Sequence, residues 1–265
     1  GSAVPRLFWT QRNGGHWLAL DGDQIRHILD MPTLFSSRAM RVPKSANPDP
    51  PMMPLMIDPP DHTVYRRLIA PAMTPFEVRR LEQRARELSV ELIEGFAPRG
   101  RCEFVSEFAQ QMPIAVFMGM LDLPPTDRPL VMAIVDRIIR PDVSETRMRG
   151  FAELGDYMLS KIGERRASPG NDLLSALAQA EVKGAPLSDA ELQGVTTVLM
   201  LAGLDTVAGM LTFIARFLAD NPAHRAKLRA SRDITARAIE EFLRRMAMVN
   251  LTREVMSDTA LDGVS

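Results

Sequence analysis

The longest apolar segment of the chain is predicted to form a single buried helix. From Ala190 to Leu218, apolar residues occupy nearly every position around the helical turn, which is typical of a helix that runs through the centre of a domain. Ser188 and Glu191 have the spacing of a capping box, in which each side chain bonds an otherwise unpaired amide. Asp220-Asn221-Pro222 ends the pattern. We therefore expect the longest helix of the molecule over residues 188–219.

The remaining pattern predicts a mainly helical fold. Asp58-Pro59-Pro60-Asp61 is suited to begin a helix, because Asp can cap free amides and proline fits the first turn. That helix is expected to continue through Ala70. Apolar residues recur with a helical period in several further segments. These are Pro75 to Gly95, Glu107 to Leu121, Asp127 to Ile139, Glu145 to Arg166, Asp172 to Glu181 and residues 234–249.

Two segments near the N-terminus depart from the helical pattern. Leu7-Phe8-Trp9-Thr10 and residues 16–20 flank a turn that contains Gly14 and Gly15, so a small β-hairpin is expected there. Residues 43–60 contain seven prolines and three methionines, a composition that resists regular structure but packs adaptably on apolar surfaces. We expect a loop there, placed over a pocket.

The last residues predict a second hairpin of which only one strand is present. Arg253-Glu254-Val255 has the composition of a strand, and Asp262-Gly263 is a favoured hairpin turn followed by only Val264 and Ser265. The expected outcome is a strand with an unpaired edge. Such an edge favours disorder or pairing with another chain.

Composition narrows the class of protein. With 265 residues, 46% of them hydrophobic, the chain is expected to form one domain over residues 1–265, incomplete at its C-terminal side. Thirty-two Lys plus Arg against 33 Asp plus Glu leave a net charge of -1, which gives no reason to expect nucleic acid as a partner. One cysteine and four histidines without metal-ligand spacing favour a reducing compartment and no structural zinc.

No targeting or membrane segment is predicted. Gly1 and Ser2 are interpreted as a cloning scar, and no secretion signal follows them. Residues 195–218 are long enough to span a bilayer, but Asp205 and Arg216 within them are costly in hydrocarbon. We therefore expect a cytoplasmic protein.

Asp205 needs an explanation, because an ionisable side chain inside an apolar helix is costly unless it is paired. The hydroxyl of Thr206 can bond back to the carbonyl of Ala202, and Gly203 removes a side chain where that turn could open. The expected result is a locally distorted helix with a small polar notch. The alternative is a capped kink or a buried salt bridge without chemical function.

Glu241 and Arg244 are three residues apart and therefore adjacent on one helix face. Ile239, Phe242 and Leu243 belong to its apolar stripe. Periodicity alone predicts a solvated ion pair at this place. Glu77 and Arg80 have the same spacing, so the motif gains meaning only from its order among others.

That order resembles a cytochrome P450. The motifs are Asp58-Pro59-Pro60-Asp61-His62, then Ala202-Gly203-Leu204-Asp205-Thr206, then Asn221-Pro222-Ala223-His224-Arg225, then Glu240-Glu241-Phe242-Leu243-Arg244-Arg245. Further stretches resemble the soluble bacterial, camphor-hydroxylase-like subgroup. They are Asn13-Gly14-Gly15-His16-Trp17, Phe35-Ser36-Ser37, Glu103-Phe104-Val105 and Arg140-Pro141-Asp142. The resemblance implies a P450-like helical fold with a small β-sheet near the N-terminus.

The resemblance also implies roles for single residues. Asp205 and Thr206 match the pair that delivers protons on the oxygen side of the haem, with Gly203 beside the cofactor. His62, Arg66 and Arg253 match residues that hold the haem propionates, a role suited to cationic donors. The Glu241–Arg244 pair matches the structural pair that supports the proximal side. Met52, Met53, Leu201 and Leu204 are candidate pocket residues, although core packing explains them nearly as well.

The implied activity is hydroxylation of a small apolar, terpenoid-like substrate with O2. Haem is the implied cofactor, and a two-iron ferredoxin with its reductase is the implied electron source. The axial ligand of the family is a cysteine in a Phe-x-x-Gly-x-x-x-Cys-x-Gly loop. Cys102 lies in no such loop, so no residue of this chain is assigned to the metal. We therefore expect the chain to be inactive by itself, with haem absent from it.

Two other hypotheses follow from the missing ligand loop. One is a non-catalytic binding or assembly module that kept the scaffold, and it predicts a stable, colourless protein. The other is haem bound through an unconventional ligand such as His62. A truncated enzyme instead is expected to expose apolar surface meant for the porphyrin and to self-associate through it or through the cut hairpin.

Overall fold

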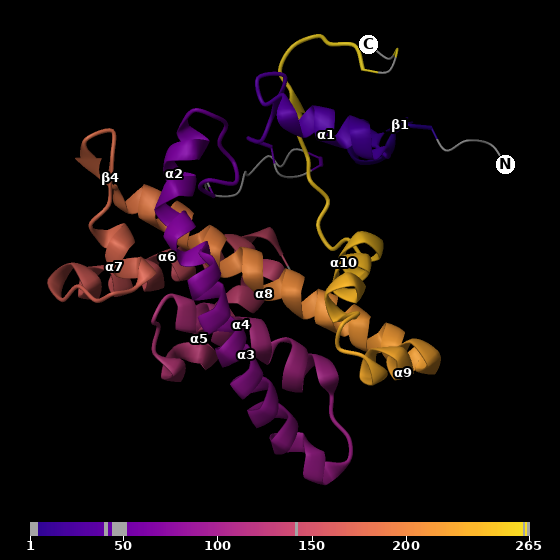
Figure 1. Ribbon diagram of the computed structural model, residues 1–265. Coiled ribbons are helices and arrows are strands. Elements are labelled where there is room, and N and C mark those ends of the chain that lie inside the picture. Colours follow the sequence, from indigo (N-terminus) through magenta and orange to yellow (C-terminus); the bar gives the residue numbers. More distant parts are fainter. Residues whose placement is uncertain (1–4, 40–41, 44–51, 141–142, 262, 264–265) are drawn as a thin grey trace. The chain divides into compact units, whose positions relative to one another are not determined.

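The computed structural model describes residues 5–39, 42–43, 52–140, 143–261 and 263 (Figure 1). These residues form two compact units, which we describe separately. The helical unit spans residues 69–250, and the split unit combines residues 1–68 with residues 251–265. The fold-class prediction is confirmed, because the described chain is mainly helical with small two-stranded sheets. The expected cloning scar at Gly1 and Ser2 and most of the proline-rich loop lie outside the described residues.

The helical unit is organised around α8, which spans Asp189–Asp220. The side chain of Ser188 accepts a hydrogen bond from the amide of Glu191, and the side chain of Glu191 bonds the amide of Ser188, which confirms the predicted capping box. α8 packs on α4 (Gln111–Met120) and α6 (Ser144–Ala167), and α6 packs on α5 (Arg128–Ile139) (Figure 1). The part of α8 up to Leu204 therefore lies in the core of this unit, as its pattern predicts, whereas Ala208 is the one buried residue of the part that follows.

The core of the helical unit consists of aliphatic side chains that the helices remove completely from solvent. Burying one such side chain is worth roughly 1.5–3 kcal/mol relative to leaving it exposed. The largest contributors on α6 and α8 are Leu154, Met158, Ile162, Leu192, Val195 and Met200. α8 also meets the length and composition criteria for a membrane span, which core helices of other proteins meet as well.

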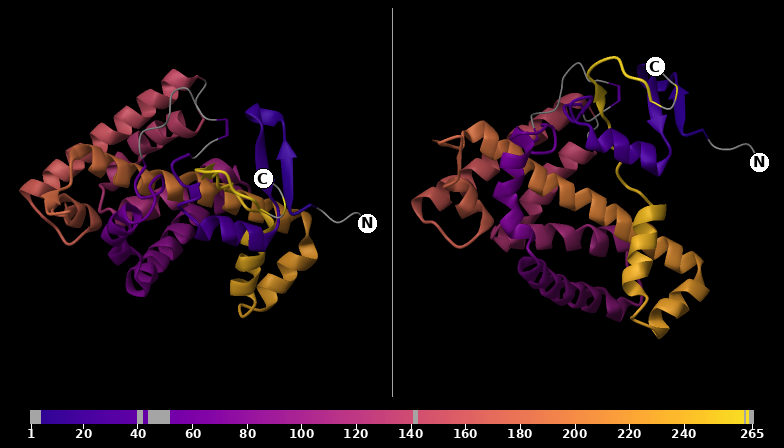
Figure 2. Two further views of the ribbon diagram at one scale, coloured as in Figure 1. Left: turned by 90° about the horizontal axis from the view of Figure 1, so that it is seen from above. Right: turned by 45° about the horizontal axis from the view of Figure 1, so that its top comes forward.

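Shorter helices complete the helical unit. α3 spans Pro75–Phe96 and packs on α4, while α7 spans Leu173–Ala178 and packs on α6. α9 (Pro222–Ala230) follows α8 directly, and α10 (Thr235–Arg245) comes next along the chain. Figure 2 shows these last two helices at the C-terminal end of α8 in both views.

One predicted helix begins with a wider turn than expected. Residues Val105–Ala109 form a π-helix, in which the amide of Gln110 bonds the carbonyl of Val105 at 2.9 Å. The regular helix α4 begins only at Gln111. Pro113 explains the change of register, because it has no amide hydrogen and is tolerated only in a first helical turn. A wide turn of this kind offsets the side chains that follow it.

Another predicted helix ends early. The pattern predicts helix from Asp172 to Glu181, but α7 ends at Ala178, and β4 (Glu181–Val182) pairs with β5 (Ala185–Pro186). Lys183 and Gly184 join the strands with φ angles of 54° and 80°. Both angles lie in the left-handed region that a tight hairpin turn needs and that glycine supplies without strain. The sequence Lys183-Gly184 could have indicated this turn, but the helical period of the preceding residues led to a prediction of helix as far as Glu181.

The split unit contains the predicted N-terminal hairpin. β1 (Leu7–Thr10) pairs antiparallel with β2 (His16–Ala19), and the two strands are the indigo arrows of Figure 2. Trp9 lies opposite Trp17, with ring centroids 5.1 Å apart in an edge-to-face arrangement. α1 (Gly22–Asp30) follows, capped by Asp21. A two-stranded ribbon is weak alone, so such cross-strand contacts matter here.

The predicted strand near the C-terminus is confirmed as β6 (Glu254–Val255). β6 pairs antiparallel with β3 (Phe35–Ser36), a neighbour that the sequence pattern did not reveal because it comes from the other part of the unit. The expected hairpin after Asp262-Gly263 stays a prediction. Gly263 has a φ of 79°, as a turn requires, and Asp262, Val264 and Ser265 lie outside the described residues.

Candidate functional site

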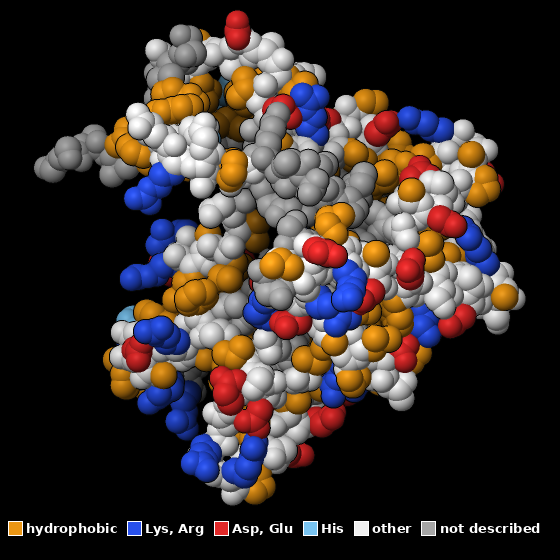
Figure 3. Space-filling view, turned by 180° about the vertical axis from the view of Figure 1, so that it is seen from behind, with side chains coloured by type: hydrophobic (Ala, Val, Ile, Leu, Met, Phe, Trp, Pro, Cys, Tyr) orange, Lys and Arg blue, Asp and Glu red, His pale blue; other side chains and the backbone are white. Residues whose placement is uncertain are grey.

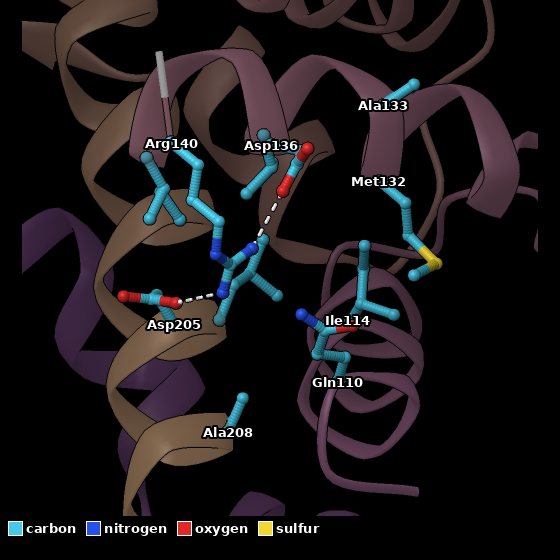
Figure 4. A pocket seen from close by; sticks show the side chains of 11 residues that line it. Gln110, Ile114, Met132, Ala133, Asp136, Arg140, Asp205 and Ala208 are labelled. Carbon is cyan, nitrogen blue, oxygen red and sulfur yellow. Dashed lines mark hydrogen bonds and ion pairs between the residues drawn. The ribbon is translucent and has the colours of Figure 1, made fainter. Parts of the chain in front are cut away.

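Asp205 lies beside a cavity of about 330 Å³ within the helical unit (Figure 4). Helices α4, α5 and α8 surround this cavity, together with Gln110 at the end of the π-helix. Its walls are mainly apolar, and its polar groups are one carboxamide, one guanidinium and two carboxylates. The lining residues are Gln110, Ile114, Met132, Ala133, Val135, Asp136, Ile139, Arg140, Leu204, Asp205 and Ala208.

Arg140 is the partner that Asp205 requires. Its Nη2 donates to Oδ1 of Asp205 at 3.1 Å, and its Nη1 donates to Oδ1 of Asp136 at 2.7 Å (Figure 4). The side chains of Asp205 and Arg140 retain 42% and 50% of their exposure. The pair is therefore not the buried salt bridge of the alternative hypothesis. Solvent weakens such pairs to about 0–1 kcal/mol, so the contact can open at little cost.

One of the two features predicted around Gly203 and Thr206 is present, namely the back-bond of the Thr206 hydroxyl, and the other, a distorted turn of the helix, is not. The hydroxyl of Thr206 donates to the carbonyl of Ala202 at 2.7 Å, which confirms the predicted back-bond. The expected local distortion is absent, because α8 is one continuous helix across this turn. A Cβ on Gly203 would come within 1.7 Å of Cε2 of Phe117, so this glycine permits close packing of α8 on α4. The assignment of Gly203 to the cofactor remains a prediction.

The candidate pocket residues are divided between the two units. Leu204 is buried and lines the cavity, whereas Leu201 is half-buried and is not among the lining residues. Thr206 is not among them either. Met52 is buried and Met53 is half-buried, both within the split unit. Their roles in a substrate pocket remain predictions.

A second polar cluster lies in the split unit around Asp58. The hydroxyl of Ser36 donates to Asp58 Oδ2 at 2.5 Å, and the amide of Ser37 donates to Oδ1 at 2.8 Å. Burial alone raises the pKa of this carboxyl. The hydrogen bonds from Ser36 and Ser37 and the positive charge of Arg253 outweigh that effect, so the pKa of Asp58 lies below its usual value of 3.8. The carboxylate therefore links β3 to the segment before α2.

The predicted propionate-binding residues belong to this same unit. His62 and Arg66 are four residues apart on α2 (Asp61–Ile69), so they share one helix face. Arg253 directly precedes β6, and its charge acts on Asp58. Cationic and N–H donors of this kind suit carboxylate groups. Ordinary surface charge is the competing interpretation for His62 and Arg66, and their assignment stays a prediction.

Glu241 and Arg244 form a bidentate pair on α10. Nε and Nη2 of Arg244 each donate to one carboxylate oxygen of Glu241 at 2.7 Å. Each group acts on the other: the guanidinium lowers the pKa of the Glu241 carboxyl, and the carboxylate raises the pKa of Arg244. Both side chains are exposed. The geometry agrees with the periodicity, and its support of a proximal surface remains a prediction.

The possible metal ligands of this chain include a single cysteine, Cys102. Cys102 is exposed and follows Arg101 in the short connection between α3 and the π-helix. Among the residues that the structure describes, no group of three or more His, Cys, Asp or Glu side chains is arranged to hold a metal ion.

Sequence reasoning missed Arg140 and Asp136 as members of the site. Arg140 was noted only as part of a motif, and it lies 65 positions before Asp205. The sequence Arg140-Pro141-Asp142 directly follows the helix predicted over Asp127 to Ile139. It could have indicated that the long, positively charged side chain of Arg140 lies at the end of a helix. Gln110 was missed because the wide turn at 105–109 was not predicted.

Comparison with known proteins agrees with the geometry. The sequence model of the cytochrome P450 family matches residues 115–265. "Cytochrome P450 109" of Bacillus spizizenii is 30% identical over 259 residues, covering 94% of this chain and 62% of that protein. A steroid C26-monooxygenase of Mycobacterium tuberculosis is 31% identical over 244 residues, covering 88% of this chain and 64% of its own length.

Solved structures show the same likeness. The crystal structure of CYP101J2 superposes with a TM-score of 0.88 at 36% identity, covering 98% of this chain and 65% of that one. CYP101C1 gives a TM-score of 0.87 at 32% identity, with coverages of 98% and 66%. The chain spans 62–66% of the length of these four proteins. With a matching family model over more than half of its residues and the Asp205–Thr206 and Glu241–Arg244 pairs in place, the chain belongs to the cytochrome P450 family.

Proposed function

We propose that this chain is the larger part of a soluble, bacterial-type haem-thiolate monooxygenase. The full-length form is proposed to hydroxylate a small apolar, terpenoid-like substrate with O2. Electrons would come from a two-iron ferredoxin and its reductase, in the cytoplasm. The observation that carries this proposal is the placement of Asp205 on α8 at the edge of an apolar cavity, next to the hydroxyl of Thr206. Family membership supports the reaction class.

The residues present fit one edge of a haem. The split unit supplies two guanidinium groups and one imidazole, from Arg66, Arg253 and His62, and these are suitable donors for carboxylates. In the helical unit, considered by itself, Ala202 and Val207 of α8 are exposed near Thr206, so small and apolar side chains are available to a flat cofactor. When bound, haem iron supplies the chemistry of O2 activation, which no side chain provides.

Within this proposal, the pair on α8 handles protons. The carboxylate of Asp205 exchanges a proton at an oxygen that is hydrogen-bonded to Arg140, so release of Arg140 frees that oxygen for water. Because Thr206 donates its own hydrogen to the carbonyl of Ala202, its oxygen remains an acceptor for a water or for a hydroxylic group. The two residues thus differ in role: Asp205 carries the charge, and the oxygen of Thr206 orients a hydrogen-bond donor.

The remaining site residues are assigned to binding and support. Met52, Met53, Leu201 and Leu204 are proposed to contact an apolar substrate, for which adaptable Met and Leu side chains are suited. Glu241 and Arg244 are proposed to support the proximal side. Their bidentate contact leaves both side chains exposed, so further partners can still reach them.

The 265-residue chain alone is proposed to be inactive. Its single cysteine, Cys102, is exposed and lacks the loop that the family uses for thiolate ligation. α8 exposes Val207 and Phe213 to solvent, at 41% and 48%. Apolar surface of this kind favours association of chains, so self-association is proposed for the chain by itself. Figure 3 shows apolar side chains among acidic and basic ones on the face seen from behind Figure 1.

Haem titration of two proteins tests the proposal. The full-length protein is expected to give a Soret band and the long-wavelength carbon monoxide shift of thiolate ligation. The 265-residue chain is expected to give no such shift. A Soret band without that shift in the full-length protein would support a ligand such as His62 instead. A stable, monodisperse full-length protein that takes up no haem would support the non-catalytic module and refute the enzyme.

A further inference from the structure

The cavity of about 330 Å³ and the surface proposed for haem lie on different faces of α8. Leu204 and Ala208 line the cavity, are four residues apart on α8, and are both buried. Ala202 and Thr206 are also four residues apart, and Ala202 is exposed. Because each residue turns the helix by about 100°, the second pair is offset from the first by about 200°. The cavity is therefore separate from the face of Ala202 and Thr206, and Asp205 lies between the two faces.

The inner walls of the cavity are apolar. Ile114 of α4, Val135 of α5 and Leu204 of α8 line it, and each is at most 6% exposed. Asp136 and Arg140 are exposed, so the cavity is open to solvent on their side. Its volume is at the lower end of the range for small-molecule pockets, roughly 300–1,000 Å³. Because Leu204 is buried against this cavity, the apolar molecule that it contacts is one bound here.

One polar group of the cavity lacks a partner. Among the residues that the structure describes, the carboxamide of Gln110 forms no hydrogen bond, and Figure 4 shows it turned towards α8. Arg140, by contrast, already bonds Asp136 and Asp205. A carboxamide offers both donors and an acceptor, and a hydroxyl group pairs with either. Gln110 is therefore suited to orient a ligand that carries a hydroxyl group.

We propose that this cavity is a second ligand site, which binds a compact apolar alcohol with its ring against the aliphatic walls and its hydroxyl on Gln110. A hydrocarbon of the same shape leaves the carboxamide unpaired. An ionised ligand loses its hydration among apolar walls, and the solvent-exposed charges of Asp136, Arg140 and Asp205 compensate little of that cost. The inference goes beyond the proposed function, because the site does not involve haem.

Methyl NMR of the full-length protein tests the site. The probes are cyclohexanol, methylcyclohexane, cyclohexanecarboxylate and cyclohexylammonium, which share one ring and differ in one substituent. The reporters are isotope-labelled methyl groups of Met132 on α5 and Ile114 on α4, both of which line the cavity. Any haem is kept reduced with carbon monoxide bound, so that it is diamagnetic and its iron is blocked. We expect cyclohexanol to shift both methyl signals saturably, and the two ionised probes to give no saturable shift.

A cavity-filling variant and its control locate the ligand. Figure 4 shows the methyl group of Ala208 directed into the cavity, so Ala208→Leu is expected to fill part of it and to abolish the saturable cyclohexanol shift. Ala219→Leu makes the same change at an exposed position of α8 that does not line the cavity. This control is expected to bind cyclohexanol as the wild type does.

A second variant tests the chemical class of the ligand and does not alter the buried walls. Gln110→Met keeps the length of the side chain and removes its hydrogen-bonding groups. It is expected to weaken cyclohexanol binding by about threefold to tenfold, the effect of one hydrogen bond, and not to weaken methylcyclohexane binding. This comparison remains decisive if Ala208→Leu does not fold.

The outcomes separate this inference from the proposed function. The absence of any saturable cyclohexanol shift in the wild type overturns the site, as does a shift that survives Ala208→Leu. If Gln110→Met weakens both neutral probes equally, or neither, or if an ionised probe binds saturably, the assignment to alcohols is wrong. A full-length protein that takes up no haem refutes the proposed function, whereas the same methyl signals still report on this cavity in the haem-free protein.

Discussion

Different interactions stabilise the interior of each of the two units. The helical unit buries large aliphatic side chains completely, with Leu88, Leu154 and Leu192 each at 1% exposure or less. The split unit leaves Phe8, Trp9 and Trp17 between 45% and 47% exposed. Its segments are joined instead by short strand pairs and by hydrogen bonds to Asp58. Hydrophobic burial dominates the first unit, and directional polar contacts dominate the second.

This difference has a consequence for cofactor binding. A packed core resists change, so α8 can hold Asp205 and Thr206 in fixed positions whether or not a ligand is present. Polar contacts at partly exposed sites are individually weak. The predicted haem-edge residues His62, Arg66 and Arg253 all belong to the weaker unit. Ligand binding is therefore expected to stabilise the split unit more than the helical unit.

The largest expected effect is a cavity in the helical unit. Leu154→Ala removes a fully buried side chain from α6 and is expected to lower the free energy of unfolding by about 2–5 kcal/mol. Urea unfolding followed by far-ultraviolet circular dichroism measures it. The matched change in the split unit is Leu18→Ala, at a side chain that is 40% exposed, with an expected cost below about 1 kcal/mol. Equal costs would contradict the contrast between the units.

The next effect concerns the contact of α8 with α4. Gly203→Ala places a methyl group against the ring of Phe117 and is expected to cost about 1–3 kcal/mol through overpacking. Gly163→Ala on α6 is the control, because nothing lies within 4 Å of its added carbon, and better helix propensity is expected to make it neutral or stabilising. Phe117→Leu combined with Gly203→Ala is expected to recover part of the loss. No recovery would show that Phe117 is not the obstacle.

A smaller effect is expected from acid on the split unit. Because the pKa of Asp58 is lower in the folded chain, its contribution to stability is present above the unfolded value and is lost as pH falls through the folded one. Arg253 and Arg38 are the cations that act on it, and Glu254 in turn neutralises Arg38. Protection of the amides at the start of α2, measured as exchange relative to the intrinsic rate at the same pH, is expected to fall below about pH 4.

The control for the acid effect is Asp58→Asn, which has no proton to gain. It is expected to show faster exchange at neutral pH, with a loss of about 1 kcal/mol, and no step at low pH beyond that of other carboxyls. An unchanged acid step in this variant would assign the titration to a different group.

The smallest expected effect is at Arg140. Arg140→Ala removes an exposed contact with Asp205 and is expected to change the free energy of unfolding by less than about 1 kcal/mol. Thermal unfolding of this variant beside Leu154→Ala gives the comparison. If Arg140→Ala lowers the free energy of unfolding as much as Leu154→Ala does, the Arg140–Asp205 pair stabilises the fold strongly and does not open easily.

The sequence predicted those features that depend on near neighbours along the chain. The capping box of Ser188 and Glu191 and the back-bond of Thr206 each involve residues three or four positions apart, so spacing alone specifies them. The Glu241–Arg244 pair was predictable for the same reason. The residues of the N-terminal hairpin were found because glycines mark its turn.

Features that depend on distant residues were not predictable in this way. The partner of Asp205 is 65 positions away, and the partner of β6 is further still. Nothing in the local pattern of residues 35–36 or 254–255 identifies one strand as the neighbour of the other. Such pairings come from packing of whole elements rather than from period or propensity. The wide turn at 105–109 is a different case, because Pro113 is only four positions beyond it and the helical period from Glu107 to Leu121 concealed this local feature.

The pairing of β3 with β6 sets an order of assembly. Arg38 and Glu254, which bond beside these strands, are 216 positions apart, and the entire helical unit is encoded between them. During synthesis the ribosome therefore releases that unit before it releases Arg253. Domains fold as units while the chain emerges, and contacts between remote positions form late. A nascent molecule therefore acquires its folded helices first and the pairing of β3 with β6 last.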